Sequence, residues 1–179
     1  MTVLALLQTS DDRLWGHLVG WQPPRWFRAW MLTASRLADG WLWPVTAVLL
    51  AADGRRGLRV LVAGALSALV ANAMLVLAKS RFRRGRPCEL AKPLAFEVAP
   101  LTWFASDRFS FPSGHALNAF AVGSVVALAY PSAALPAFAL AASIAASRVV
   151  LGLHWLSDVI AGALAGATIG SCVFFALLA

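Results

Sequence analysis

The sequence predicts an all-α protein, a polytopic bundle of about five to six transmembrane helices with a functional site at one membrane interface. Of the 179 residues, 60% are hydrophobic and only 13% are charged, whereas about a quarter of a soluble domain is charged. Three runs lack charged side chains: 60–78, 116–147 and 159–179. A membrane-spanning helix needs ~20 mostly apolar residues. Each run can therefore cross a bilayer, and the middle one is long enough to cross it twice.

The first 36 residues differ from this pattern, so we expect an interfacial segment at 1–36 followed by a transmembrane domain at 37–179. Trp and Arg residues alternate through the segment, and the prolines at 23–24 interrupt it. Amphipathic helices rich in Trp and Arg favour the plane of the membrane interface. A helix packed on the flank of the protein itself explains the same pattern equally well.

The first predicted span covers about 37–52, with Pro44 near its start, where a missing N–H is tolerated. The stretch "DGRRG" at 53–57 predicts a tight turn, and 58–78 predicts the second span. Residues 79–111 carry many charges. We therefore expect them to connect two spans outside the hydrocarbon.

The third span is predicted at 113–130, and the prolines in 131–136 turn the chain into the fourth, about 135–150. A break at Gly152 leads to the fifth span, about 155–178.

The last span carries Gly162, Gly166 and Gly170 at four-residue spacing. Such a stripe lets two helix backbones approach closely in lipid. We interpret it as a packing surface rather than a catalytic feature.

Counting spans places four polar segments at one membrane face, because each span reverses the direction of the chain. These segments are Lys79–Pro87, Pro112–His115, Arg148 and His154–Asp158. Charged groups at membrane depth are costly, so they are functional candidates by default.

The cations of this face predict a phosphate-binding pocket. Lys79, Arg86 and Arg148 supply ammonium and guanidinium groups suited to phosphate oxygens. Ser113 and Gly114 precede a helix whose unpaired N–H groups and positive dipole end favour anions.

The histidines of this face predict phosphoryl transfer. His154 and Asp158 are four residues apart, so the carboxylate can orient the imidazole and leave its other nitrogen free to attack. His115 comes from a different helix and can donate a proton to a leaving oxygen near neutral pH. Asn118, about one turn further on, is a candidate for the pocket wall.

Three sequence motifs carry a family resemblance. "KSRFRRGRP" (79–87), "PSGH" (112–115) and "SRVVLGLHWLSD" (147–158) resemble the motifs K-x6-RP, PSGH and SR-x5-H-x3-D of the type-2 phosphatidic acid phosphatase (PAP2) superfamily. The resemblance covers roughly 58–178 and implies a bundle of six membrane helices, although 1–36 contains no clean span.

The resemblance also implies roles for the site residues. His154 would be the nucleophile that forms a phosphohistidine, Asp158 would orient it, and His115 would protonate the leaving group. No metal or other cofactor is expected. The residues expected to hold the phosphate oxygens are Lys79, Arg86, Ser113, Gly114 and Arg148.

The other charged residues near the motifs receive plainer interpretations. Arg81, Arg83, Arg84 and Arg108 are expected to face lipid headgroups or solvent. Asp39 is interpreted as a residue that starts a helix.

Together these features predict hydrolysis of a lipid phosphomonoester or pyrophosphate, of the polyprenyl, phosphatidic acid or phosphatidylglycerophosphate type. Transfer of the phosphoryl group to a second lipid remains an alternative with the same site. A non-enzymatic anion-binding membrane protein would explain the cations but not the pairing of His154 with Asp158. The net charge of +7 is assigned to membrane lipids and an anionic substrate rather than to nucleic acid. The oligomeric state stays open.

Basic residues in short loops bear on the orientation of the protein in the membrane. Arg55, Arg56 and Arg59 lie at the end away from the site. The site end keeps more bases even when the phosphate-binding cations are discounted, which favours a cytoplasmic site. The family resemblance implies the opposite. We follow the resemblance and expect a bacterial inner-membrane protein whose site faces outward.

Overall fold

The computed structural model describes residues 3–19, 21–90 and 109–179. Over these residues it is helical, with turns and extended connections and no strand. The elements are α1 Val3–Val19, α2 Arg25–Arg36, the π-type turn η1 Leu37–Trp41, α3 Leu42–Ala51, α4 Gly54–Phe82, α5 Pro87–Leu90, α6 Gly114–Ala129, the 3₁₀ turn η2 Pro131–Ala133, α7 Ala134–Val150 and α8 Leu156–Leu177.

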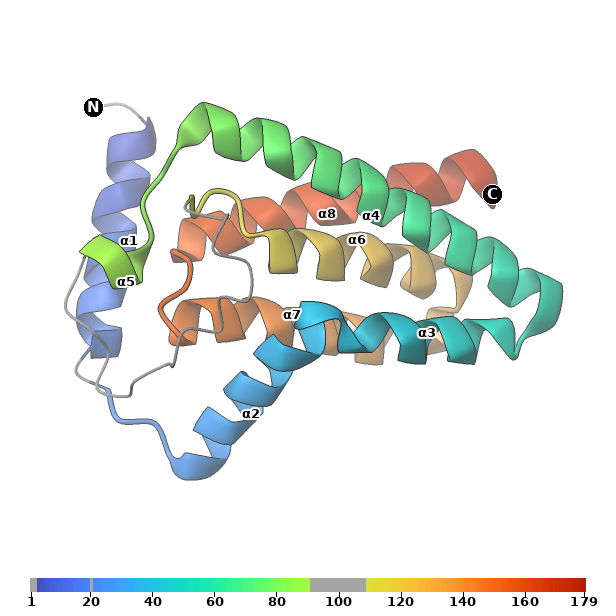
Figure 1. The fold of residues 1–179 in the computed structure, drawn as a ribbon, viewed down its shortest axis with the longest axis horizontal. Coiled ribbons are helices and arrows are strands. Elements are labelled where there is room, and N and C mark those ends of the chain that lie inside the picture. The colour runs from blue at the N-terminus through green and yellow to red at the C-terminus, as the bar shows by residue number, and fades with distance from the viewer. Residues whose placement is uncertain (1–2, 20, 91–108) are drawn as a thin grey trace.

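Helices α3, α4, α6, α7 and α8 form an elongated bundle with α6 at its centre, packed against α4, α7 and α8 (Figure 1). Three helical segments are long and apolar enough to span a membrane: 54–82, 131–150 and 156–177. Helix α6 is apolar but shorter. The prediction of an all-α polytopic membrane bundle is confirmed, and the protein is an integral membrane protein.

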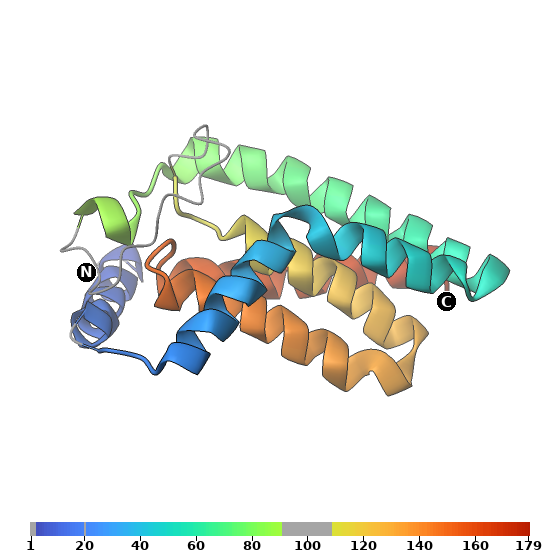
Figure 2. The same cartoon turned by 60° about the horizontal axis from the view of Figure 1, so that its bottom comes forward.

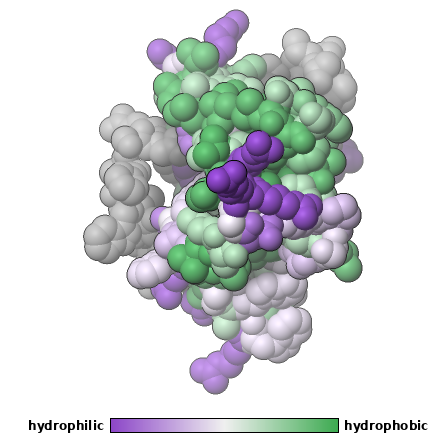
Figure 3. Space-filling view, turned by 90° about the vertical axis from the view of Figure 1, so that its right-hand side faces the viewer, coloured by the Kyte–Doolittle hydropathy of each residue, from purple (hydrophilic) through white to green (hydrophobic). Residues whose placement is uncertain are grey.

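The outer surface of the bundle suits lipid rather than water. Large apolar side chains are exposed along its helices, among them Leu69, Val76, Leu135 and Leu164. Figure 3 looks onto the end where α3 turns into α4, and hydrophilic groups gather there amid an apolar surround. Such a polar end above apolar flanks is the arrangement expected where a bundle leaves the hydrocarbon.

Helix α1 lies across the ends of the long helices (Figure 1) and packs against the start of α8. Trp15 is buried there, with its ring centroid 6.1 Å from that of Trp155. Helix α2 runs obliquely over α7 (Figure 2). It buries Met31 and Ala34 while Trp26 stays exposed. Helix α2 thus packs on the flank of the protein, and the position of segment 1–36 in the membrane interface stays a prediction.

The helix of the first predicted span begins before residue 37. The helical path starts at Arg25 and bends at Gly40, which has φ 132°. Glycine adopts this backbone region without the steric cost that other residues pay. The bend turns an oblique segment into α3, which runs with the bundle.

The predicted turn at 53–57 is also shorter than expected, since α4 already begins at Gly54. Gly57 lies so close to α3 that a Cβ there would come within 1.6 Å of the carbonyl oxygen of Leu50. At its other end α4 continues to Phe82, so Lys79 lies on the helix and not in a loop. The predicted connection therefore starts later, and its part at 91–108 lies outside the described residues.

The glycine stripe of α8 packs against α6, as predicted. A Cβ on Gly166 would lie 2.1 Å from the carbonyl oxygen of Leu117, and one on Gly170 would lie 2.1 Å from that of Ala121. At Gly162 the corresponding distance to the Ser113 oxygen is 2.6 Å. Only hydrogen at these positions allows the two backbones to come this close. The contact holds the first turns of α6 and α8 together.

Candidate active site

A cavity of ≈ 1210 Å³ lies along α6, between α3 and α7, and extends to the first turn of α6. Five predicted site residues line it: Arg86, Gly114, His115, Arg148 and His154. They come from sequence positions up to 68 residues apart. The topology argument is therefore correct for these five.

His154 is 2% exposed and sits in the turn between α7 and α8. Its Nδ1 lies 2.7 Å from the carbonyl oxygen of Ser110, so Nδ1 carries the proton and donates it there. Asp158 Oδ2 is further away, at 3.7 Å. The Ser110 carbonyl is thus a closer orienting partner than the predicted carboxylate. Nε2 is left with its lone pair.

Burial lowers the pKa of His154 to about 4, and the positive charges of Arg148 and Arg86 act in the same direction. The nearby carboxylate of Asp158 opposes this effect but does not outweigh it. The imidazole is therefore neutral at pH 7. A neutral imidazole is the form that can act as a nucleophile.

Asp158 is fully buried in the first turn of α8. Its Oδ1 accepts a hydrogen bond from Arg84 Nη1 at 2.7 Å, and its Oδ2 accepts one from the backbone N–H of Trp155 at 2.9 Å. Its own carbonyl oxygen accepts the backbone N–H of Ser113 at 3.0 Å, joining the starts of α8 and α6. Asp158 lies behind His154 and does not line the cavity.

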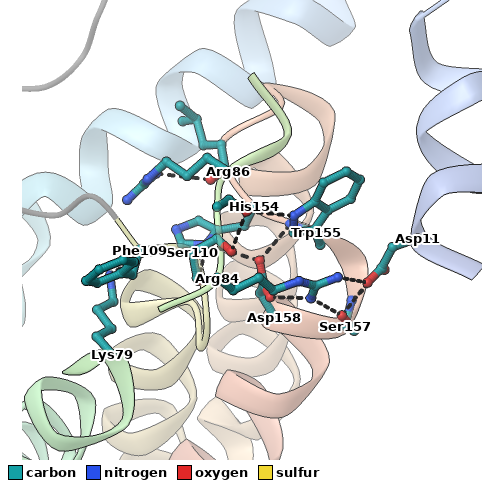
Figure 4. Close-up of polar contacts among 12 residues, drawn as sticks. Asp11, Lys79, Arg84, Arg86, Phe109, Ser110, His154, Trp155, Ser157 and Asp158 are labelled. Carbon is teal, nitrogen blue, oxygen red and sulfur yellow. Dashed lines mark hydrogen bonds and ion pairs between the residues drawn. The ribbon is translucent and has the colours of Figure 1, made fainter. Parts of the chain in front are cut away.

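Arg84 is the functional candidate that the sequence reasoning missed. Only 17% of its side chain is exposed, and its Nη2 lies 2.7 Å from Asp11 Oδ2, so the expectation of a headgroup-facing charge is wrong (Figure 4). Its guanidinium bridges Asp11 of α1 and Asp158 of α8 and lies 5.3 Å from the Trp155 ring centroid. Two buried carboxylates need a counter-charge, and Arg84 supplies it. Arg108 lies outside the described residues.

The predicted phosphate-binding cations are each held by a protein acceptor. Lys79 Nζ donates to the carbonyl of Phe109 at 3.1 Å, and Arg86 Nη1 donates to that of Leu153 at 3.0 Å. Arg148 Nη1 donates to Ser35 Oγ at 2.5 Å. Arg86 and Arg148 line the cavity, whereas Lys79 and Ser113 do not.

The first turn of α6 offers an anion site. Ser113 caps the helix with extended backbone (φ −73°, ψ 114°), and its buried Oγ has no hydrogen-bond partner among the described residues. The first N–H groups of a helix have no partner within it. They point toward the space before the helix and favour an anion there.

His115 has a partner that the sequence reasoning interpreted differently. Its Nε2 lies 2.8 Å from Asp39 Oδ1, so Asp39 is more than a residue at a helix start. Asn118 lines the cavity as proposed, and its Nδ2 donates to the carbonyl of Gly114 at 3.0 Å. No sequence spacing links Asp39 to His115, which are 76 residues apart.

The fold and the site together define a polytopic helical membrane protein with histidines and cations around one cavity. The chain belongs to the PAP2 superfamily, which matches residues 56–177. The assignment made from the three motifs is thereby confirmed.

Relatives of known function are phosphatases of bacterial lipids. The chain is 38% identical over 123 residues to decaprenylphosphoryl-5-phosphoribose phosphatase of Mycobacterium tuberculosis, a match covering 66% of this chain and 62% of the relative. It is 36% identical over 101 residues to lipid A 1-phosphatase of Rhizobium johnstonii, covering 56% and 39%. The chain therefore spans less than two thirds of the length of these relatives.

Two solved structures share the fold. Aquifex aeolicus LpxE superimposes with a TM-score of 0.73 and 24% identity, covering 91% of this chain and 93% of that one. A transmembrane PAP2-type phosphatidylglycerolphosphate phosphatase from Bacillus subtilis gives a TM-score of 0.68 at 24% identity, covering 94% and 84%.

Proposed function

We propose that this protein is a metal-independent phosphatase that hydrolyses a lipid phosphomonoester or pyrophosphate through a phosphohistidine intermediate. The observation that carries the proposal is the cavity, which His154, His115, Arg86 and Arg148 line together. A neutral nucleophile, a second imidazole and two guanidinium groups then surround one anionic group. The phosphatases among its relatives support the same reaction class.

In the proposed reaction, His154 Nε2 attacks the phosphorus atom while the bond to the lipid oxygen breaks. His115 gives its proton to that leaving oxygen. Water then attacks the phosphohistidine, His115 takes a proton from it, and phosphate leaves. Arg86, Arg148 and Gly114, which line the cavity, would stabilise the charge on the phosphoryl oxygens. Lys79 and Ser113 do not line it and would have to turn toward the phosphate to contribute.

Asp158 would act through His154 in this scheme. Its carboxylate, 3.7 Å from Nδ1, stabilises the positive charge that the ring acquires when Nε2 bonds to phosphorus. Arg84 keeps that carboxylate in place and ionised.

The shape of the cavity supports a substrate with a long hydrocarbon chain. Beyond the polar end its wall is largely apolar, including Trp43, Leu49, Val122 and Leu140. It continues to Tyr130, just past the far end of α6. Helix α6 has 16 residues and is therefore ~24 Å long. An acyl or prenyl chain could lie along it while its phosphate reaches His154.

The test is phosphate release from phosphatidic acid and a polyprenyl phosphate by the purified protein in detergent. His154→Gln should lower the rate by at least ~10³-fold, because no other nucleophile replaces the ring. His17→Gln, which changes an exposed histidine on α1, should leave it unchanged. Equal rates for the His154 variant and the wild type would refute the assignment.

Two further measurements separate the alternatives. EDTA should not affect the rate if no metal takes part. Adding a second lipid with a free hydroxyl should not create a phosphorylated product, because water is the proposed acceptor. Formation of such a product at the expense of phosphate would identify a lipid phosphotransferase instead.

We also propose that the protein lies in the bacterial inner membrane with its site facing outward. Arg84 is bound to carboxylates within the protein, so it does not count among the loop bases that determine orientation. Arg55, Arg56 and Arg59 are exposed at the opposite end. Short cytoplasmic loops carry an excess of Lys and Arg, so these three residues favour a cytoplasmic position for that end. Cys88, exposed near the site, should react with an impermeant thiol reagent in intact cells exposing the outer face of this membrane. Labelling only after permeabilisation would show that the site faces the cytoplasm instead.

A further inference from the structure

We propose that Asp39 is a positioning residue that orients His115 and supports its protonated form. The site would then contain two carboxylate–imidazole pairs. Asp158 and His154 would serve phosphoryl transfer, and Asp39 and His115 would serve proton transfer. This inference rests on the proposed phosphatase function and adds a residue outside the three family motifs.

The contact arises from the bend between α2 and α3. Gly40, with φ 132°, directs the chain back over the start of α6, and Asp39 directly precedes it. Asp39 Oδ1 lies 2.8 Å from His115 Nε2, and both residues line the cavity. The pair is thus made by an element far from α6 in the sequence. Its geometry depends on one glycine.

The charges around His115 explain why it needs a carboxylate. Burial disfavours a protonated imidazole most strongly, and the guanidinium groups of Arg148 and Arg86, which attract the substrate, repel it as well. Asp39 acts in the opposite sense, through both its charge and its hydrogen bond. Asp39 therefore offsets part of the effect of burial and of the cations, and His115 without it would carry its proton less often.

The hydrogen bond also assigns the two ring nitrogens. When Nε2–H donates to Asp39, Nδ1 is the atom that can exchange a proton with the leaving oxygen. In the first step that proton moves from Nδ1 to the lipid oxygen as the phosphorus–oxygen bond breaks. In the second step Nδ1 takes a proton from the attacking water. Asp39 itself neither gives nor takes a proton in either step.

Leaving-group dependence distinguishes this role from a structural one. An alkyl oxygen leaves as a strong base and needs a proton, whereas p-nitrophenolate leaves without one. Asp39→Asn should therefore lower kcat/KM for dioctanoyl phosphatidic acid, which reports the steps up to formation of the phosphohistidine, by about 10- to 100-fold, within the range of general acid catalysis. For p-nitrophenyl phosphate kcat/KM should change less than about threefold, because the later attack of water on the phosphohistidine does not enter this ratio. Asp39→Glu, which keeps a carboxylate, should recover part of the phosphatidic acid rate.

Two comparisons complete the experiment. Asp12→Asn, on the exposed side of α1, should match the wild type with both substrates. In a His115→Ala background, Asp39→Asn should cause no further loss, because the residue acts through that ring. If Asp39→Asn does not fold, Asp39→Glu is the variant to measure. A larger loss of kcat/KM for phosphatidic acid than for p-nitrophenyl phosphate, relative to wild type, supports the role, and equal losses contradict it.

Equal losses in kcat/KM with the two substrates, or a further loss in the His115→Ala background, would overturn the inference while leaving the phosphatase function intact. Wild-type protein that releases phosphate from neither substrate would overturn both.

Discussion

Replacing Gly166 with alanine should separate α6 from α8 and disable the site without touching any residue in it. The added Cβ would lie 2.1 Å from the carbonyl oxygen of Leu117 and 3.0 Å from the backbone nitrogen of Ala121. Ordinary contact begins at 3.4 Å. Both neighbours are backbone atoms, so no side chain can rotate away. The helices must move apart by roughly 1.3 Å, the difference between 3.4 and 2.1.

The cost of this movement has two parts. Overpacking of this kind destabilises by about 1–3 kcal/mol. The movement also acts on the site, because α6 carries His115 and α8 carries Asp158. The hydrogen bond from Ser113 N–H to Asp158 O, now 3.0 Å, would lengthen with it. A misplacement of ~1 Å costs about 10²-fold in rate, so we expect a loss of that order.

The assay is phosphate release from phosphatidic acid together with thermal unfolding, both in detergent. Gly64→Ala is the matched control, because Gly64 also faces α6 but its nearest neighbour is a side-chain atom, Val122 Cγ1, at 3.7 Å. It should keep the wild-type rate and stability. If Gly166→Ala kept the wild-type rate and unfolding temperature, the spacing of α6 and α8 would not control the site.

Two more predictions concern the charges behind His154. Arg84→Met leaves Asp11 and Asp158 without their shared cation, so it should lower the free energy of unfolding by about 3–5 kcal/mol. Arg81→Met, at an exposed position, should not, and equal unfolding temperatures for the two variants would refute the buried network. The pKa of His154 is lowered from 6.5 to about 4 by burial, so the unfolded chain binds a proton there before the folded protein does. Stability should therefore fall by about 3 kcal/mol as the pH drops from 6.5 to 4 and then level off. Unfolding measured across this range should lack that component in His154→Gln.

The long helices could be predicted because their signal is local. Charge-free runs define α6, α7 and α8, and the predicted bounds agree with the structure to within about two residues. The oblique course of α2 and the position of α1 could not be predicted in this way. They depend on the conformation of Gly40 and on contacts such as Trp15 with Trp155, which join distant parts of the chain.

The same distinction applies to the residues of the site. The motif residues His115, Arg86, Arg148 and His154 could be placed together because each is fixed to the end of a predicted span. Their partners Asp39 and Ser110 could not, because they belong to a bend and an extended connection without periodicity.

Arg84 illustrates the physical reason most clearly. The sequence offers Arg81, Arg83 and Arg84 as near-equivalent cations, and any of them could have neutralised Asp158. The choice is made by Arg83, whose left-handed backbone (φ 46°) ends α4 after Phe82. The residues that follow, 84–86, have no regular secondary structure. After this turn Arg83 is exposed, whereas Arg84 contacts the two carboxylates. Arginine has no particular preference for the left-handed region, so its sequence carries no signal for this turn.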